Sequence, residues 1–344
     1  MGDIMACSDL TCCVDWVSFT FPIDYTVDDA IRFCGFNFED IIMLKGGASG
    51  YTRKCKHVNY NIWFLFDGNE NMGVHVDCSG SAVQYLITSV LTCVDTPFGD
   101  GHLVDDFAKS ELVNFFIKMT NVVKFTRIDL AIDDMTGKYY SLQELHEIGE
   151  DRNYIALFKQ WREVFTKDTS DGHCLGYTIY MGSRDSDTFI RVYDKKLEQE
   201  QKNISVLYPS WVRWEMEIKH NNADMLARKI CDYIEIKELV FDLLNRYIRV
   251  IDLASNSRKC RCKNTDKWDS FIGAVHRIRL KRNNADIDII ERKRKWLHDA
   301  VSKSLSMCIA SDGGDTGLIY DMLEYGRKKY NNSDMQIIKE KMMM

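Results

Sequence analysis

The chain has 344 residues, of which 45% are hydrophobic and 28% charged, a composition typical of a globular protein with a substantial core. Its net charge of -6 argues against nonspecific coating of nucleic acid, and no apolar run approaches the roughly 20 residues of a membrane span. The first residues lack the basic and apolar regions of a signal peptide, so a cytoplasmic protein is expected. The 12 scattered cysteines form no paired CxxC pattern, which favours free thiols and argues against a zinc site.

Alternating and amphipathic patterns predict a run of strands and helices in the N-terminal third. Thr26 is a suitable N-cap that precedes acidic residues, and the glycine-rich stretch 46–50 is typical of a hairpin turn. His75 and Asp77 share one strand face and could approach an acidic site, although a lone strand histidine is more often an ordinary side chain. The expected elements are a strand over 15–21, a helix over 26–34, a hairpin within 41–66, a strand over 73–80 and a helix over 81–94.

The stretch 124–134 reads KFTRIDLAIDD and is typical of a strand with one charged side. Side chains alternate between the two faces of a strand, so Arg127, Asp129 and Asp133 share a face. Carboxylates on one face repel one another and lower stability unless a cation lies among them. The pattern therefore indicates a polar site on this strand.

Two further stretches, 187–199 (DTFIRVYDKKLEQ) and 211–219 (WVRWEMEIK), also predict strands with a charged side. The side chains that share a face are Arg191, Tyr193 and Lys195 in the first strand, and Arg213, Glu215 and Glu217 in the second. If the strands are neighbours, one surface carries a phenol, three cations and two carboxylates, which is unlike a core.

This mixture of groups suits cleavage of a phosphodiester. The reaction needs a nucleophile, cations that hold the phosphate, and oxygen ligands for a hard metal ion. Taken alone, each strand also fits an amphipathic tyrosine at the edge of a core or a solvated acidic face. The third charged strand, 124–134, favours one common site.

The C-terminal third differs from the rest of the chain in charge. Residues 256–300 contain 13 Lys and Arg against 6 Asp and Glu, which gives this segment +7 and leaves −13 elsewhere. A basic segment on an acidic protein suits a phosphate-binding surface, although a solvated helix face with a chance excess of charge would look the same. The other expected elements are helices over 105–119, 141–149, 223–253 and 288–307, a hairpin of 176–183 with 188–195, and a tail helix through 327.

Strands interspersed with helices, including direct hairpins, predict an α+β fold with a mainly antiparallel central sheet and flanking helices. Only three prolines and no evident internal linker favour one catalytic body. We expect an N-terminal segment over 1–14, a catalytic domain over 15–310 that includes the basic segment 256–300, and a polar tail over 311–344.

Several motifs follow one another in a defined order over roughly residues 15–308. They are DWVSFTF, GVHVDCSGSAVQYL, FTRIDLAIDD, YMGSRDSDTFIRVYDKKLEQE, WVRWEMEIKH, KWDSFIGAVHRIRL and IERKRKWLHDAVSKSLSM. In this order the chain resembles the trans-acting rolling-circle replication initiators of small Gram-positive plasmids, whose relatives serve phages and conjugative elements as origin nickases or relaxases. Motifs in series are more specific than any one alone.

The resemblance implies a fold like that of the HUH endonucleases without their paired-histidine metal motif, which this sequence also lacks. It implies that Tyr193 attacks one DNA strand at a hairpin origin and leaves a 5′-phosphotyrosine and a free 3′-hydroxyl. A phenol has a reference pKa near 10, so a divalent ion and adjacent cations would favour the phenolate and stabilise the transition state. Arg191 and Lys195 would hold the phosphate or the phenolate.

The carboxylates of the charged faces are the expected ligands of the metal ion. Asp129, Glu215 and Glu217 are the first choices and Asp133 is a fourth; alternation leaves open which of them bind directly. Ligand sets made of oxygen atoms favour Mg²⁺ or Mn²⁺ over zinc. The resemblance places origin choice downstream of the tyrosine, where phosphate contacts would position the DNA. The cations expected to contact DNA are Arg213, Arg258, Lys259, Arg261, Lys263, Lys267, Arg277, Arg279, Lys281 and Arg282.

The resemblance also implies a host helicase as a partner and a homodimer, and it leaves three functions open. The chain nicks an origin to initiate rolling-circle replication, or it nicks the transfer origin of a mobile element as a relaxase, or it binds an origin without catalysis. Because Tyr193, Arg191, Lys195 and the carboxylates are all present, the non-catalytic alternative is disfavoured. Replication initiation is the preferred interpretation.

Overall fold

The structure of the chain is a computed structural model that describes residues 10–93, 109–202, 204, 206, 208–273, 294 and 297–330. It divides into two compact units, Met1–His276 and Arg277–Met344, and each is described by itself. The division falls inside the expected catalytic domain 15–310, whose functional limits stay a prediction. Within the described residues, none of the helices is long and apolar enough to cross a membrane.

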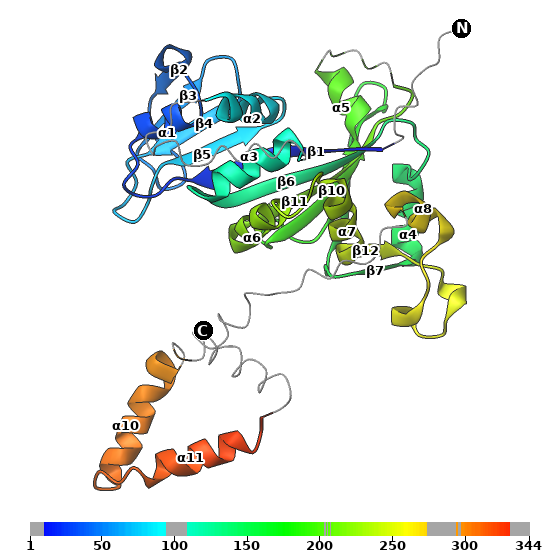
Figure 1. Cartoon of the computed structure of the whole chain (residues 1–344). Helices are drawn as coiled ribbons and strands as arrows, with labels where there is room; N and C mark the ends of the chain where they lie inside the picture. Colours follow the sequence, from blue (N-terminus) through cyan, green and yellow to red (C-terminus); the bar gives the residue numbers. More distant parts are fainter. Residues whose placement is uncertain are drawn as a thin grey trace. The chain divides into compact units, whose positions relative to one another are not determined.

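The first unit is built on a ten-stranded antiparallel sheet with the strand order β2-β3-β4-β5-β1-β6-β11-β10-β9-β8 (Figure 1). In chain order, its strands are β1 (Leu10–Thr20), β2 (Ile41–Leu44), β3 (Arg53–His57), β4 (Ile62–Phe66), β5 (His75–Ser79), β6 (Lys124–Asp134), β8 (Trp161–Lys167), β9 (Cys174–Met181), β10 (Thr188–Asp194) and β11 (Val212–Lys219). Two short strands, β7 (Tyr154–Ala156) and β12 (Ile248–Val250), form a second sheet.

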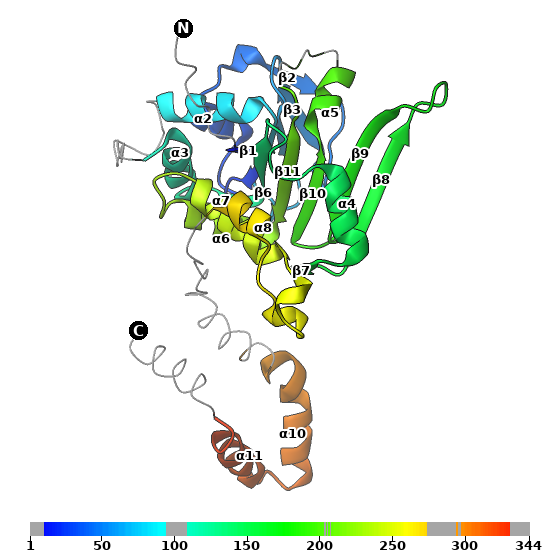
Figure 2. The same cartoon turned by 90° about the vertical axis from the view of Figure 1, so that its right-hand side faces the viewer.

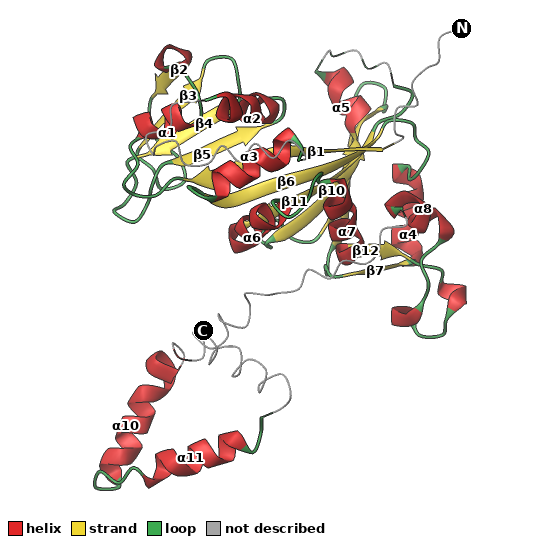
Figure 3. Ribbon diagram, in the orientation of Figure 1, coloured by secondary structure: helices red, strands yellow, loops and turns green. Residues whose placement is uncertain are grey.

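Helices α2, α3, α6 and α7 lie along one face of the large sheet (Figures 2 and 3). The helices of the first unit are α1 (Val27–Phe33), α2 (Ala82–Thr92), α3 (Glu111–Thr120), α4 (Leu142–Asp151), α5 (Lys195–Gln201), α6 (His220–Ile230), α7 (Lys237–Tyr247) and α8 (Asp266–Ile272). The second unit contains a π-helical turn (Leu297–Val301), α10 (Ser302–Ser311) and α11 (Gly317–Arg327). This arrangement confirms the predicted α+β class with a mainly antiparallel sheet.

The core lies between the sheet and these helices. On β6, Ile128, Leu130 and Ile132 are fully buried, and they alternate with the charged residues of the same strand. On β11, the ring of Trp214 packs against Trp268 of α8 with 5.9 Å between ring centroids. This contact holds α8 against the sheet that carries the charged strands.

The structure confirms several of the sequence predictions and shows why they held. Thr26 caps α1 in a capping box with Asp29, and Ser141 caps α4 in the same way with Glu144, so both helix starts follow from local side-chain chemistry. The stretch 41–66, expected to be a hairpin, forms three antiparallel strands. The first strand of the chain, expected over 15–21, begins earlier, at Leu10.

Other predictions were wrong. The long helix expected over 223–253 is interrupted after Ile230. Its last part is strand β12, in which the β-branched residues Ile248 and Val250 flank Arg249 and the three residues pair with β7. The strand expected over 187–199 ends at Asp194, whose side chain accepts the backbone N–H of Leu197 at 2.9 Å and so starts α5. Strands β7 and β8 were not predicted. The helix expected over 288–307 lies partly outside the described residues.

Candidate active site

The three charged strands predicted from the sequence are neighbours, with β11 between β6 and β10. The register sets Glu215 opposite Arg191 on β10, and Glu217 opposite Asp129 on β6. Tyr193 shares its face with Arg191 because the two residues are two apart on the strand. We call the sheet face that carries these five residues the polar face; it is opposite the face that α2, α3, α6 and α7 cover.

Tyr193 is half-buried on the polar face. Its hydroxyl donates a hydrogen bond to Oε2 of Glu215 at 3.1 Å. Burial and then the neighbouring charge of Glu215 raise the pKa of Tyr193 well above its ordinary value. The phenol is therefore protonated at neutral pH, and the predicted phenolate beside favouring cations is not the resting state of this side chain.

Glu215 and Asp129 are both fully buried, yet their carboxyl groups differ in charge. Burial is the largest single influence on Glu215 and opposes its ionisation, but the hydrogen bond and charge of Arg191, together with the hydrogen bonds from Asp129 and Tyr193, keep its pKa below the ordinary value. Burial raises the pKa of Asp129 to about 7, in spite of its hydrogen bonds from Arg127. Around neutral pH, Glu215 is thus ionised and able to accept the Tyr193 proton, while Asp129 is partly protonated.

Arg127 lies between Asp129 and Glu217 on the polar face and contacts both carboxylates. Its Nε and Nη2 donate to the two oxygens of Asp129 at 2.8 and 2.6 Å, and its Nη2 lies 2.9 Å from Oε2 of Glu217. Lys219 lies 3.0 Å from the other oxygen of Glu217, and the Arg127 guanidinium covers the ring of Trp16 at 4.1 Å. The sequence placed Arg127 on this face without a role, and it gave no signal for Trp16.

Asp133 and Arg213 form a separate buried pair. Nε and Nη2 of Arg213 donate to the two oxygens of Asp133 at 2.7 and 2.8 Å, and Trp211 donates to Asp133 at 2.7 Å. A register shift in β1 between Val14 and Trp16 brings in Asp15, which lies 2.5 Å from Arg213. Both charges are thereby matched inside the protein, so the structure supports neither Asp133 as a metal ligand nor Arg213 as a DNA contact.

Replacing Arg213 with leucine is expected to destabilise the first unit by about 3–5 kcal/mol, because Asp133 would stay buried without its cation. Urea unfolding followed by tryptophan fluorescence measures this loss. The control Arg228→Leu removes a guanidinium that is 58% exposed and pairs with Asp224 on α6, and it should cost less than about 1 kcal/mol. Equal losses in the two variants would contradict the structural role of Arg213.

Lys195 is not on the strand face where the sequence placed it, because it is the first residue of α5. Its Nζ lies 2.6 Å from Oε2 of Glu198 on the next turn and 5.6 Å from the centre of the Tyr193 ring. The cation is thus beside the tyrosine, as expected, but it contacts the face of the ring and is already paired with a carboxylate.

The predicted basic segment is only partly within the described residues. Arg258, Lys259, Arg261 and Lys263 are exposed, and Lys259 covers the ring of Tyr154 at 5.3 Å. Lys267 is exposed too and pairs with Glu144 of α4. The predicted DNA contacts outside the described residues are Arg277, Arg279, Lys281 and Arg282.

Among the described residues, the oxygens of Asp129, Glu215 and Glu217 do not gather within 4.8 Å of one another, and cations already contact all three carboxyl groups. The Arg191 guanidinium contacts Glu215 and lies 3.7 Å from Oδ2 of Asp129, so a positive charge is favourable between these two carboxyls. Burial, and not a lack of neighbouring cations, is the largest cause of the raised pKa of Asp129, so metal binding at these carboxyl groups stays a prediction. Glu217 lies at the same level as Asp129 on the adjacent strand. Hard oxygen ligands of this kind suit Mg²⁺ or Mn²⁺.

Two other polar clusters have internal partners. His75 shares a hydrogen bond of 3.0 Å with Thr20, and Asp77 accepts one of 2.7 Å from Trp16, so both are satisfied on their strand face. Among the described residues, three ligand atoms also come within 4.8 Å of one another in the turn between β8 and β9, and they belong to Asp168, Asp171 and His173. Hydrogen bonds within that turn account for their arrangement.

The raised pKa of Asp129 predicts a pH dependence of stability in metal-free buffer. Between the ordinary value of 3.8 and about 7, the folded chain keeps a proton that the unfolded chain has lost, so this group lowers the free energy of unfolding as pH rises. Because asparagine cannot ionise, Asp129→Asn should gain stability relative to the wild type between about pH 5 and about pH 8. Urea unfolding in the presence of EDTA measures the free energy of unfolding of both proteins across this pH range. If the difference between Asp129→Asn and the wild type does not change with pH, the pKa of Asp129 is not raised.

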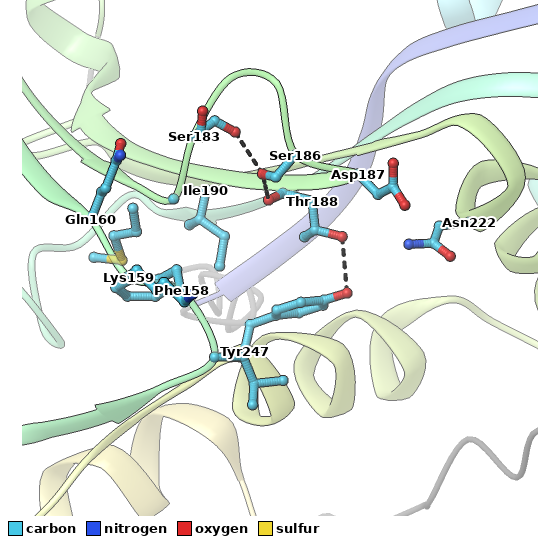
Figure 4. A pocket seen from close by; sticks show the side chains of 13 residues that line it. Phe158, Lys159, Gln160, Ser183, Ser186, Asp187, Thr188, Ile190, Asn222 and Tyr247 are labelled. Carbon is cyan, nitrogen blue, oxygen red and sulfur yellow. Dashed lines mark hydrogen bonds between the residues drawn. The ribbon is translucent and has the colours of Figure 1, made fainter.

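A cavity of about 420 Å³ lies on the other side of β10 (Figure 4). Thr188 and Ile190 line it, and they alternate with the polar-face residues of the same strand. The hydroxyl groups of Tyr247 and Thr188 share a hydrogen bond of 2.9 Å in its wall. None of the polar-face residues lines this cavity, so it is not part of the site around Tyr193.

The chain is similar to known proteins in both sequence and fold. The chain is 26% identical over 312 residues to the "Putative DNA relaxase NicK" of Bacillus subtilis (strain 168), which covers 89% of this chain and 82% of the relative. Its fold is similar to that of a rolling circle replication initiator protein from Geobacillus stearothermophilus, with a TM-score of 0.63, 24% identity, and coverage of 78% of this chain and 98% of the other. The sequence profile described as "Replication initiation factor" matches residues 123–323, which include β6, β10 and β11. Because this match spans more than half of the chain, the protein belongs to the replication initiation factor family, as its motifs predicted.

Proposed function

We propose that this member of a DNA-nicking family cleaves one DNA strand at a replication origin, with Tyr193 as the nucleophile. The observation that carries the proposal is the hydrogen bond from the Tyr193 hydroxyl to the buried, ionised carboxylate of Glu215. Arg191 holds the same carboxylate. A protonated nucleophile, a base in contact with it and a cation beside both are the groups that attack on a phosphodiester requires.

In the proposed reaction, Glu215 takes the proton from Tyr193 as the phenolic oxygen bonds to the scissile phosphorus. The bond between phosphorus and the 3′-oxygen breaks, so the phosphate stays bonded to the 5′-oxygen of the next nucleotide and to Tyr193. The 3′-oxygen leaves and takes a proton from water. Arg191 is suited to hold the phosphate oxygens, because its Nε has no hydrogen-bond partner among the described residues. Religation is the reverse of these steps.

Mg²⁺ or Mn²⁺ is the proposed cofactor, held by Asp129, Glu215 and Glu217. When bound, such an ion withdraws charge from the scissile phosphate. The remaining steps belong to the chain itself: Glu215 accepts the proton, Arg191 holds the phosphate, and the buried Arg213–Asp133 pair keeps β6 and β11 in register beside the tyrosine.

Initiation of rolling-circle replication is the preferred biological role, and mobilisation as a relaxase is the second candidate because a curated relative bears that name. The two roles share the same cleavage chemistry. A non-catalytic origin-binding protein is disfavoured, since Tyr193, Glu215 and Arg191 form an intact site. A host helicase and a homodimer remain proposals that follow from the family resemblance.

Isolation of the covalent intermediate tests the function. Supercoiled DNA that carries the origin next to the gene for this protein is incubated with the full chain and Mg²⁺ or Mn²⁺. The reaction is stopped with detergent, the protein is digested, and the DNA-linked peptide is identified by mass spectrometry. We expect nicked circles and a nucleotide-linked peptide that contains Tyr193. A linkage to another residue, or nicking without any adduct, would overturn the proposal.

The exposed part of the basic segment is expected to contribute to origin binding and not to cleavage. Reversing the charge of Arg258, Lys259, Arg261 and Lys263 to glutamate should weaken binding of duplex origin DNA by at least about tenfold, because four phosphate contacts would be lost. Cleavage of a short single-stranded oligonucleotide should stay within about twofold of the wild type. Equal losses in the gel-shift and cleavage assays would rule out this division of labour.

A further inference from the structure

Strand β9 adds an aromatic and cationic cluster to the polar face, next to the proposed nucleophile. The register places Tyr180 opposite Arg191, and Arg162 of β8 opposite Tyr180. The ring of Tyr180 stacks on Phe189 with 5.6 Å between centroids and an interplanar angle of 17°. The guanidinium of Arg162 covers the Tyr180 ring at 4.9 Å, and that of Arg184, from the turn between β9 and β10, does so at 5.6 Å.

These two arginines differ from the central arginines of the polar face in their lack of carboxylate partners. Arg127, Arg191 and Arg213 are each ion-paired with at least one carboxylate. Within the part of the chain that the structure describes, no carboxylate lies within ion-pair distance of Arg162 or Arg184, and both are exposed. Their positive charge is therefore available to an anion from solution.

The distance to Tyr193 suits a nucleotide next to the scissile phosphate. Neighbouring strands are about 4.8 Å apart and a strand rises about 3.3 Å per residue, so the backbones at Tyr180 and Tyr193 are roughly 8 Å apart. Consecutive stacked bases on one strand are separated by about 3.4 Å. At that spacing, a base at Tyr180 is about two nucleotides from a phosphate at Tyr193.

We propose that Tyr180, Arg162 and Arg184 form a subsite for single-stranded DNA, in which a base beside the cleaved phosphate takes the place of the arginine guanidinium groups on the Tyr180 ring and the two arginines turn to hold the flanking phosphates. The proposal rests on the proposed function, because it takes Tyr193 as the point of cleavage. An aromatic ring recognises the face of any base and an arginine recognises any phosphate, so the subsite selects unstacked single strand over duplex and does not select sequence. Phe189, which is buried, holds the Tyr180 ring in place by stacking against it.

Binding of two oligonucleotides to a non-cleaving background, Tyr193→Phe, tests the subsite. Fluorescence anisotropy compares labelled dT12 with a twelve-residue abasic strand that has the same phosphates and no bases. Tyr180→Ala should weaken dT12 binding about 5- to 150-fold and change binding of the abasic strand by less than about twofold. Tyr180→Phe should retain the binding of dT12, because the ring remains.

The arginines should affect both strands, since they contact phosphates. The double variant Arg162→Gln/Arg184→Gln should weaken binding of dT12 and of the abasic strand alike. It should also reduce the slope of log K against log salt by about 1.4, or about 0.7 for each lost phosphate contact. Arg228→Gln on the helical side, with a guanidinium of similar exposure, is the matched control and should leave the slope unchanged.

Phe165→Ala is the matched aromatic control, because this exposed ring lies on the same hairpin and stacks on Tyr177 on the opposite face. Its binding of dT12 should equal that of the background chain. The subsite is overturned if Tyr180→Ala binds dT12 as the background chain does, or if it loses affinity for both strands equally. Failure of the proposed function is a separate result, because it appears as a wild type that forms no DNA adduct.

Discussion

Tyr193→Phe is expected to abolish nicking of origin DNA and the covalent protein–DNA adduct together. The substitution removes one oxygen atom, which is the atom proposed to bond to phosphorus, and it leaves the ring in place between Arg191 and Lys195. Loss of a covalent nucleophile lowers the rate by at least about 10³-fold. A gel assay that separates supercoiled from nicked circles, with a detergent-stable shift for the adduct, measures both losses.

The chain contains a matched control for this experiment on the other face of the same sheet. Tyr177 also donates its hydroxyl to a glutamate, at 2.7 Å from Oε2 of Glu163, and its pKa is also raised, by burial and by that hydrogen bond. Tyr177→Phe should nick as the wild type does. Undiminished nicking by Tyr193→Phe would place the nucleophile elsewhere, and equal loss in both variants would show an effect on folding.

Glu215→Gln is expected to lower the nicking rate by about 10²- to 10⁴-fold, the range that a general base contributes. Glutamine has nearly the same shape but cannot take the proton from Tyr193, whose pKa is raised by burial and by Glu215 itself. Binding of dT12 should change by less than about threefold, because the proposed single-strand contacts Arg162, Tyr180 and Arg184 do not pair with Glu215. Single-turnover cleavage of an oligonucleotide, with binding measured in parallel, separates the two effects.

Glu163→Gln is the corresponding control, since Glu163 accepts the Tyr177 hydroxyl in the same manner without any proposed part in cleavage. Its nicking rate should stay within about twofold of the wild type. If Glu215→Gln nicks at the wild-type rate, the proton of Tyr193 goes to another acceptor and the role proposed for Glu215 is wrong. If its rate falls only as far as its binding does, Glu215 acts on DNA affinity alone.

The central strands of the site could be predicted from the sequence because their signal is local. Alternation of apolar and charged residues in 124–134 and 211–219 fixed which side chains share a face. The family motifs indicated that these strands belong to one site. The same reasoning failed at Lys195, because the Asp194 side chain accepts an N-capping hydrogen bond from the backbone N–H of Leu197 and so starts α5. The alternation of apolar and charged residues does not reveal such a cap.

The ion pairs of the site could not be predicted, because they join strands that are distant in sequence. Arg213 reaches Asp133 only because β11 pairs with β6 in one particular register, and it reaches Asp15 only because β1 has an irregularity at that residue. From the sequence, Asp133 and Asp129 look alike. In the structure, a guanidinium binds both oxygens of each carboxyl group, but Asp133 also accepts a hydrogen bond from Trp211, whereas burial raises the pKa of Asp129 to about 7.

The saturation of the central carboxylates by cations has a consequence for fidelity. Among the described residues, each arginine beside Tyr193 already has an acidic partner, so these arginines bind an incoming phosphate less strongly than unpaired arginines would, although Nε of Arg191 is available. Contacts elsewhere on the nucleic acid must supply the rest of the binding energy. A DNA strand that contacts only the tyrosine is therefore not cleaved. Cleavage requires a strand whose flanking nucleotides are already bound.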